Sequence, residues 1–145
     1  MAFEPLQLRG NKKIGTGAAG TPADVDDQVI EFRVVAKRAT VEVPRTFGAR
    51  KSFRAGEDTY DLEIRFLQDT DTTALSMIFW DAIADADGTI NFTATLRDGT
   101  VSASNPEWAG VAIVTGTDLG GQVDEIGVST LTLPLLDRPT KNTGA

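Results

Sequence analysis

The spacing that comes nearest to a chemical motif in this chain is a run of glycines close to its N-terminus. Gly15-Thr-Gly17-Ala-Ala-Gly20 satisfies G-x-G-x-x-G, the pattern of loops that hold the pyrophosphate of a dinucleotide. Such a loop works between a strand and a helix whose N-terminus faces the phosphates. Here Thr21-Pro22 and the acidic run at 24–27 follow the glycines. We therefore interpret residues 15–20 as part of a flexible arm and predict no nucleotide cofactor.

Carboxylates are the other groups with catalytic potential. They occur as the neighbouring pairs Asp26-Asp27, Glu57-Asp58 and Asp124-Glu125. A glycosidase needs two carboxyl groups facing one cleft, whereas neighbours along a strand point to opposite faces. We interpret these pairs as solvated surface. The run from Asp24 also resembles the start of a calcium loop, but Val29 and Val35 stand where an EF-hand needs Gly and Glu, so we predict no metal.

The sequence of 145 residues has no His and no Cys. The commonest general base, the commonest metal ligand, thiolate nucleophiles and disulfides are therefore all missing, and we predict that the protein is not an enzyme. No apolar run approaches the roughly 20 residues of a membrane helix, and Met1-Ala-Phe-Glu-Pro5 lacks the features of a signal peptide. We expect a soluble protein with no membrane partner.

The net charge of −7 is divided unevenly along the chain. Residues 1–54 carry 10 Lys and Arg against 6 Asp and Glu, whereas residues 55–145 carry 4 against 15. A protein that binds DNA stably is usually basic overall, so this balance argues against that function. The division favours contact between the basic segment of one copy and the acidic surface of another.

A strand, a helix and a second strand are predicted between residues 59 and 97. Apolar and polar residues alternate from Tyr60 to Phe66 and again from Ile90 to Leu96, the period of half-buried strands. Between them we expect a helix over 72–86 with Asp71 as its N-cap. One face of this helix carries an apolar stripe, with Trp80 at its edge, and the stripe consists of Leu75, Ile78, Phe79, Ala82, Ile83 and Ala86. We predict that Leu75, Ile78, Phe79 and Ala82 fasten the helix to a sheet.

The rest of the chain divides into an arm, one domain and a tail. Residues 1–27 show little periodicity and are expected to form an extended arm, and residues 138–145 are polar and are expected to form a flexible tail. The single domain covers 28–137. Its first long strand begins near Gln28, with a short return strand over Thr40–Val43. A loop follows over 44–57, whose length, cations and phenylalanines indicate a docking segment.

The order of these features resembles the major tail tube proteins of long, non-contractile-tailed bacteriophages. The resemblance spans about Gln28 to Pro139 and is carried mainly by three stretches. These are Asp58 to Ala84, with Thr72-Thr-Ala-Leu-Ser-Met-Ile-Phe-Trp-Asp-Ala, then Trp108-Ala-Gly-Val-Ala-Ile-Val-Thr-Gly, and Gly121-Gln-Val-Asp-Glu-Ile-Gly-Val-Ser-Thr-Leu-Thr-Leu-Pro-Leu. The resemblance implies a mainly β (α+β) fold, a β-sandwich or partial barrel of two packed antiparallel sheets with one flanking α-helix.

The resemblance also implies a structural role in the virion. Six copies would close into a ring, and stacked rings would form the tail tube through which DNA is ejected into the host. The partners would be further copies, the tape-measure protein, the tail terminator and tail-tip proteins, with DNA only passing through the channel. Such a protein would be found in the virion tail, and in the host cytoplasm during assembly.

Two groups of residues are candidates for contacts in such a tube. The long loop would contact neighbouring subunits or rings through Arg45, Phe47, Arg50, Lys51, Phe53 and Arg54. The polar faces of the two predicted strands would face the channel or a neighbour through Asp61, Glu63, Asn91, Thr93 and Thr95. The alternatives are the tube of a contractile tail or secretion apparatus, and a β-sandwich binding module that stacks a carbohydrate on Trp108.

Overall fold

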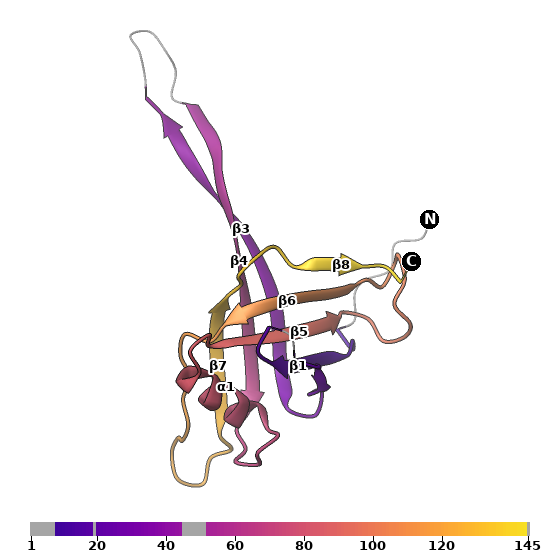
Figure 1. Cartoon of the computed structure of the whole chain (residues 1–145), viewed down its shortest axis with the longest axis vertical. Helices are drawn as coiled ribbons and strands as arrows, with labels where there is room; N and C mark the ends of the chain where they lie inside the picture. Colours follow the sequence, from indigo (N-terminus) through magenta and orange to yellow (C-terminus); the bar gives the residue numbers. More distant parts are fainter. Residues whose placement is uncertain (1–7, 19, 45–51, 145) are drawn as a thin grey trace.

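The computed structural model describes residues 8–18, 20–44 and 52–144 (Figure 1). Two antiparallel sheets pack against each other without closing into a barrel, which confirms the expected fold class. One sheet has five strands in the order β2-β1-β5-β6-β8, and the other has three in the order β3-β4-β7. The elements are β1 (Lys12–Thr16), β2 (Ala23–Asp24), β3 (Val29–Val43), β4 (Ser52–Leu67), α1 (Leu75–Ala84), β5 (Thr89–Thr95), β6 (Glu107–Ile113), β7 (Val128–Pro134) and β8 (Thr140–Asn142).

The core forms where the apolar faces of the two sheets meet. On β4 the alternation predicted from the sequence puts Leu62, Ile64 and Phe66 inward, each at most 1% exposed. The facing sheet contributes Ile90 and Phe92 of β5, and these five side chains belong to one buried cluster. An edge contact between the rings of Phe32 and Phe92, with centroids 5.7 Å apart, joins the two sheets directly. Removal of this apolar surface from water is the main force that holds the sheets together.

Helix α1 covers one end of this core. Leu75, Phe79 and Ala82 are buried, Ile78 is partly buried, and the ring of Phe79 lies 5.2 Å from that of Phe66. Ile83 is 48% exposed and lies outside the buried stripe. None of the helical structure in the described residues has the length and apolarity that a membrane span needs.

The helix is shorter than the predicted 72–86, and Asp71 is not its N-cap. Ala74 occupies the N-cap position and cannot cap the helix with its own side chain, but the Gln28 side-chain oxygen accepts a hydrogen bond from the backbone N–H of Leu75 over 2.8 Å. The Asp71 carboxylate instead accepts hydrogen bonds from the backbone N–H and the hydroxyl of Thr73. Residues 71–74 therefore form a turn held by a local aspartate interaction, which competes with the helical backbone pattern.

The arm predicted over 1–27 is wrong for the part of it that forms strands. β1 pairs with β5 from Lys12 to Thr16, and β2 pairs with β1. Ile14 is 1% exposed and Val25 is 2% exposed, so both belong to the core. Each is an isolated apolar residue in a polar stretch, and a pattern of period two or 3.6 does not detect a single anchoring side chain. Residues 1–7 lie outside the described residues.

The C-terminal segment is also attached to the sandwich. β8 pairs with β6 through Glu107↔Asn142, Trp108↔Lys141 and Ala109↔Thr140. The pairing is made by backbone groups, which explains why the polar side chains of this segment gave no sign of it. The predicted flexible tail therefore has a strand over Thr140–Asn142.

The predicted loop over 44–57 is wrong for residues 52–57, which belong to β4. The expected return strand over Thr40–Val43 is the far end of β3, which continues through an irregularity in register between Arg38 and Thr40. The two strands pair as far as Val43↔Ser52. Both faces of this part of the hairpin meet solvent, so its sequence lacks the alternation of apolar and polar residues that normally indicates a strand.

We expect Phe79→Ala to destabilise the monomer by about 3–5 kcal/mol, because it removes a fully buried ring and leaves a cavity beside Phe66. The measurement is urea unfolding followed by circular dichroism. Ile83→Ala, on the exposed side of the same helix, is the matched control and should change the free energy of unfolding by less than about 0.5 kcal/mol. Equal losses in the two variants would contradict the packing described here.

Candidate assembly surface

The longest feature of the molecule is a two-stranded ribbon that projects from the sandwich (Figure 1). β7 pairs with β4 only over Asp61–Leu67, so residues 52–60 of β4 and 36–43 of β3 are paired with each other and not with β7. We call these two segments the ribbon. A two-stranded hairpin without a core of its own is marginally stable in water. A ribbon of this length is therefore expected to gain a partner.

The described part of the ribbon exposes apolar side chains together with charged side chains of both signs. Val41 is 55% and Phe53 is 58% exposed, and Val41 stands opposite the exposed Arg54. Phe53 and Arg54, two of the predicted contact residues, thus lie in β4 and not in a loop. The other four, Arg45, Phe47, Arg50 and Lys51, lie outside the described residues. The connection between the strands nevertheless carries only cations, because the sequence from Pro44 to Gly56 contains no Asp or Glu.

A hydrogen bond marks the base of the ribbon. The Tyr60 hydroxyl donates to the Asp58 carboxylate over 2.5 Å. This bond lowers the pKa of Asp58, with smaller contributions from a backbone hydrogen bond and from Arg38 and Arg138. The same bond raises the pKa of Tyr60 above its ordinary value of 10.0. No sequence pattern predicted this contact, since Asp58 and Tyr60 are two residues apart in a strand and such a spacing has no distinctive signature.

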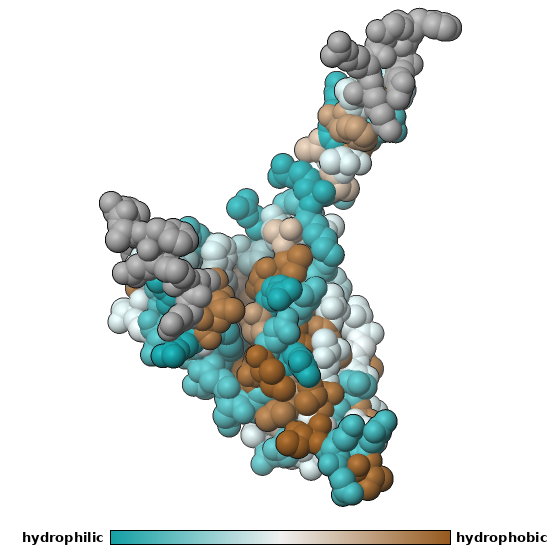
Figure 2. All heavy atoms as spheres, turned by 180° about the vertical axis from the view of Figure 1, so that it is seen from behind, coloured by the Kyte–Doolittle hydropathy of each residue, from teal (hydrophilic) through white to brown (hydrophobic). Residues whose placement is uncertain are grey.

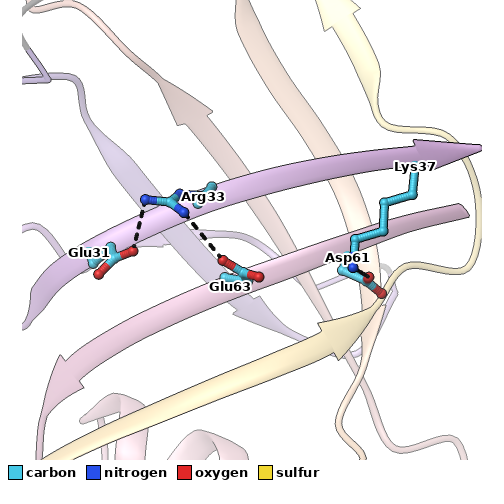
Figure 3. Close-up of polar contacts among 5 residues, drawn as sticks. All are labelled: Glu31, Arg33, Lys37, Asp61 and Glu63. Carbon is cyan, nitrogen blue, oxygen red and sulfur yellow. Dashed lines mark ion pairs between the residues drawn. The ribbon is translucent and has the colours of Figure 1, made fainter.

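The face of the three-stranded sheet that points away from the core carries charges of both signs (Figure 3). Arg33 lies 3.3 Å from Glu31 and 3.8 Å from Glu63, and Lys37 lies 3.9 Å from Asp61. These side chains are between 25% and 65% exposed, so each ion pair contributes little to stability. We call this surface the outer face. Asp61 and Glu63 lie on this face, where cations balance their charge, and their contact with a channel or a neighbour stays a prediction.

Two of the three predicted channel-facing or neighbour-facing residues of β5 are less exposed than Asp61 and Glu63 of β4. Asn91 and Thr95 are only 8% and 6% exposed, because the N-terminal segment covers them. The Thr95 hydroxyl accepts a hydrogen bond from the backbone N–H of Asn11 over 2.9 Å. Their expected role as channel-facing or neighbour-facing residues is therefore wrong. Thr93, between them, is half-buried and lines an open hollow of about 660 Å³ on the five-stranded sheet.

Asn91 also explains the glycines that resembled a nucleotide loop. Its amide donates to the carbonyl oxygens of Gly17 and Gly20 over 3.0 and 2.6 Å. A Cβ on Gly15 would lie 2.6 Å from the Asn91 side-chain oxygen, and Gly17 has a φ of +66°, which favours glycine. The segment is thus attached to β5 by close backbone approach, which is a structural use of the motif.

Two segments, residues 68–88 and 115–127, lie at the end of the molecule opposite the ribbon, and all of their charged side chains are acidic. Hydrogen bonds join its parts, from Gly120 to the Gln68 side chain, from Gln68 to the Gly127 carbonyl, and from Val114 to the Gly88 carbonyl. Residues 68–88 and 115–127 contain no Lys or Arg. We call this region the acidic end, and its carboxylates are Asp69, Asp71, Asp81, Asp85, Asp87, Asp118, Asp124 and Glu125.

The acidic end also exposes large apolar side chains. Trp80 and Ile83 of α1 are 53% and 48% exposed. Val123 and Ile126, in the connection between β6 and β7, are 89% and 80% exposed. Figure 2 shows hydrophobic residues gathered over the lower part of the body, away from the ribbon. Exposed apolar groups within a charged rim are typical of protein interaction sites.

The described residues show no arrangement suited to metal binding. No cluster of carboxylates in that part of the chain could hold a metal ion. Trp108, the platform of the alternative carbohydrate-binding function, lies within β6, with the Lys141 ammonium 5.9 Å from its ring centroid. A cation over the ring competes with a sugar for that face.

Comparison with solved structures finds chains of similar fold. No protein-family model and no curated protein sequence matches the chain. The structure is similar to a chain of the SPP1 tail tube, solved by solid-state NMR and cryo-EM, with a TM-score of 0.72 and 13% identity. That match covers 96% of this chain and 80% of the other. The chain has the fold of a phage tail tube protein.

A second match comes from an assembly of another kind. The structure is similar to a chain of the anti-feeding prophage baseplate, solved by cryo-EM with six-fold symmetry imposed. The TM-score is 0.59 at 13% identity, over 99% of this chain and 98% of that chain. The resemblance drawn from the sequence is therefore confirmed at the level of the fold.

Tyr60 is the single tyrosine of the chain, so its ionisation can be measured directly to test the hydrogen bond at the base of the ribbon. We expect Tyr60 to ionise above pH 10.0, because the Asp58 carboxylate stabilises its protonated phenol. The stabilisation should be present at neutral pH and should be lost as the pH rises through the elevated pKa. Absorbance of the tyrosinate in a pH titration measures this pKa.

Asp58→Asn should lower the pKa of Tyr60 toward its ordinary value. Asp61→Asn, which removes a carboxylate one residue away that does not bond to Tyr60, is the matched control and should leave that pKa near the unsubstituted chain's. Identical titrations of all three proteins would contradict the bond.

Proposed function

We propose that this protein is the structural subunit of a tail tube, in which copies join side by side into hexameric rings and the rings stack end to end. The observation that carries this proposal is the ribbon, which projects from the sandwich and exposes a long stretch of backbone and side chains in an isolated subunit. A monomeric protein gains nothing from such a projection, whereas a subunit of a stacked assembly can insert it into its neighbour.

The distribution of charge supports a head-to-tail contact. The ribbon ends in the segment 44–56, which has four cations and no carboxylate, and the acidic end lies at the opposite extreme of the molecule. Both regions expose apolar side chains, Val41 and Phe53 on one and Trp80 and Ile126 on the other. Stacking would therefore bring opposite charges and apolar surfaces together, as a heterologous interface that repeats along one axis requires.

The outer face suits a channel through which DNA passes. It carries three cations, Arg33, Lys37 and Arg65, and three carboxylates, Glu31, Asp61 and Glu63, so the surface offers no net positive charge to the phosphates. Affinity for DNA comes mainly from cations that neutralise phosphates. We assign the outer face, with Asp61 and Glu63, to the channel wall, where DNA would move past without being retained. The tape-measure protein would occupy the same channel before ejection.

Two kinds of tube fit the structure, since one similar chain belongs to a tail tube and the other to the baseplate of an anti-feeding prophage. The tube of a long, non-contractile tail is our first proposal because the tail tube is the match of higher TM-score. A contractile tail or secretion apparatus is the second. A sheath around the native tube in electron micrographs would favour the second.

The direct test is negative-stain electron microscopy of the purified protein. We expect rings with six-fold symmetry, and tubes at high protein concentration. A protein that stays monomeric at high concentration, with neither rings nor tubes after nucleation by tail tips, would overturn the proposal.

Reversal of the charge at the end of the ribbon should impair stacking. We expect Arg50→Glu/Lys51→Glu/Arg54→Glu to raise the protein concentration needed for tubes at least about tenfold, which corresponds to roughly 1.4 kcal/mol. The fold should stay intact, because Arg54 is exposed and far from the core. Sedimentation of tubes measures assembly, and circular dichroism measures the fold.

The matched control is Arg50→Lys/Arg54→Lys, which keeps every charge and should assemble normally. Adding Asp81→Lys/Asp85→Lys at the acidic end to the reversed ribbon should recover part of the assembly. An unchanged tube yield in the triple reversal would exclude the ribbon from stacking.

A further inference from the structure

The connection between β6 and β7 is long and leaves its own apolar side chains exposed. Residues 115–127 form neither helix nor strand, and we call this segment the β6–β7 loop. A connection of this length inside a compact domain is usually functional or disordered. Val123 and Ile126 are the most exposed large apolar side chains of the described residues, so their burial does not hold the loop in place. Its shape must depend on hydrogen bonds instead.

Gln68, the residue that follows β4, contacts this loop at two points. Its side-chain oxygen accepts a hydrogen bond from the backbone N–H of Gly120 over 3.0 Å. Its backbone N–H donates to the carbonyl oxygen of Gly127 over 2.9 Å. Its side-chain nitrogen donates to the Ser129 hydroxyl over 2.9 Å. Gln68 therefore ties the end of β4 to the loop and to the start of β7.

Ser129 extends this contact to a third point of the loop. It is fully buried, and its hydroxyl donates to the carbonyl oxygen of Asp118 over 3.2 Å. The directions are consistent, because the N–H of Gly120 requires the side-chain oxygen of Gln68, which turns the amide nitrogen toward Ser129. Hydrogen bonds linked in this way strengthen one another. We call Gln68 and Ser129 the loop hub.

The bonds of Gln68 to the loop lie on either side of a turn that carries the exposed apolar residues. The backbone N–H of Glu125 donates to the carbonyl oxygen of Gln122 over 3.3 Å, and Asp124 has a φ of 66°. Within the described residues, no other residue except glycine has a positive φ. Such a conformation persists where the surroundings hold the backbone in place. Val123 and Ile126 are thus presented on a turn of defined shape.

We propose that Gln68 is a positioning residue of the stacking contact, which holds the β6–β7 loop in the shape that receives the ribbon of another copy. This inference rests on the proposed function and adds to it how the receiving surface is prepared. A preformed loop avoids the conformational entropy that an unconstrained loop loses on binding. Gln68 acts through Val123 and Ile126, which would make the contact. Because Gln68 stands at the end of β4, one strand supports both the ribbon and the surface that receives it.

Gln68→Met removes the hydrogen bonds of this side chain but keeps its length. The backbone N–H of Gly120 then loses its acceptor, and we expect its hydrogen exchange in the monomer to become about tenfold faster. The protein concentration needed for tubes should also rise about tenfold, because the loop must then be ordered on binding. Ser129→Ala, which removes the other half of the loop hub, should change both quantities in the same direction. NMR measures the amide exchange, and sedimentation measures the tubes.

A conservative replacement separates hydrogen bonding from packing. The carboxylate of Gln68→Glu still accepts from the N–H of Gly120, so this variant should keep slow exchange there and the tube concentration of the unsubstituted protein. A role in packing alone would instead let Gln68→Met behave like the unsubstituted protein. The matched control is Gln122→Met, the same change at an exposed glutamine of the loop. It should alter either quantity by less than about twofold.

The outcomes separate the positioning role from the proposed function. Faster exchange confined to the loop, together with weaker tube formation, supports the role of Gln68. Unchanged exchange, faster exchange throughout the sandwich, or faster loop exchange with normal tubes overturns that role and leaves the tube function standing. If the unsubstituted protein forms no tubes, the proposed function is overturned and the positioning role falls with it.

Discussion

The structure depends on one strand that is buried along half of its length and projects along the other half. Over Leu62, Ile64 and Phe66, β4 supplies the centre of the core, where Phe66 contacts the helix and β7 covers the neighbouring edge. Before Asp61 the same strand pairs with β3 alone, apart from one hydrogen bond from the Leu135 N–H to the Tyr60 carbonyl. The core therefore acts as a rigid base for the ribbon, because any change in the orientation of β4 within the sandwich also moves the exposed end.

Buried apolar side chains and surface charges have different roles in this molecule. Apolar side chains hold the sheets and the helix together, and the ion pairs of the outer face are too exposed to add much to stability. Charge is instead uneven along the sequence, with only cations among the charged residues of 44–56 and only carboxylates among those of the acidic end. Such a separation does nothing for an isolated fold, but it orients copies that approach one another.

The edges of the sheets are the second architectural constraint. Short strands end the five-stranded sheet, whereas the long β3 and the central position of β4 leave the three-stranded sheet open on both sides. A sheet with an odd number of alternating strands has edges that run in the same direction.

The sequence by itself determined the elements whose patterns are strong. Residue types alone predicted the two alternating strands, over Tyr60–Phe66 and Ile90–Leu96. They also predicted the apolar stripe of the helix and the uneven distribution of charge. Sequence periodicity reports one-sided burial, so it could not detect segments that lack it. The single anchors Ile14 and Val25, the ribbon with two wet faces, and β8, which is held by its backbone, were missed for this reason.

Only the tertiary structure decided which strands share a sheet. It separated Asp61 and Glu63, on an open face, from Asn91 and Thr95, which the N-terminal segment buries. The four residues have similar local patterns, and the difference arises from contacts between positions more than 70 residues apart, such as that of Asn91 with Gly17. Local sequence specifies which face of a strand is polar, whereas long-range packing decides whether that face meets solvent, a neighbour or the chain itself.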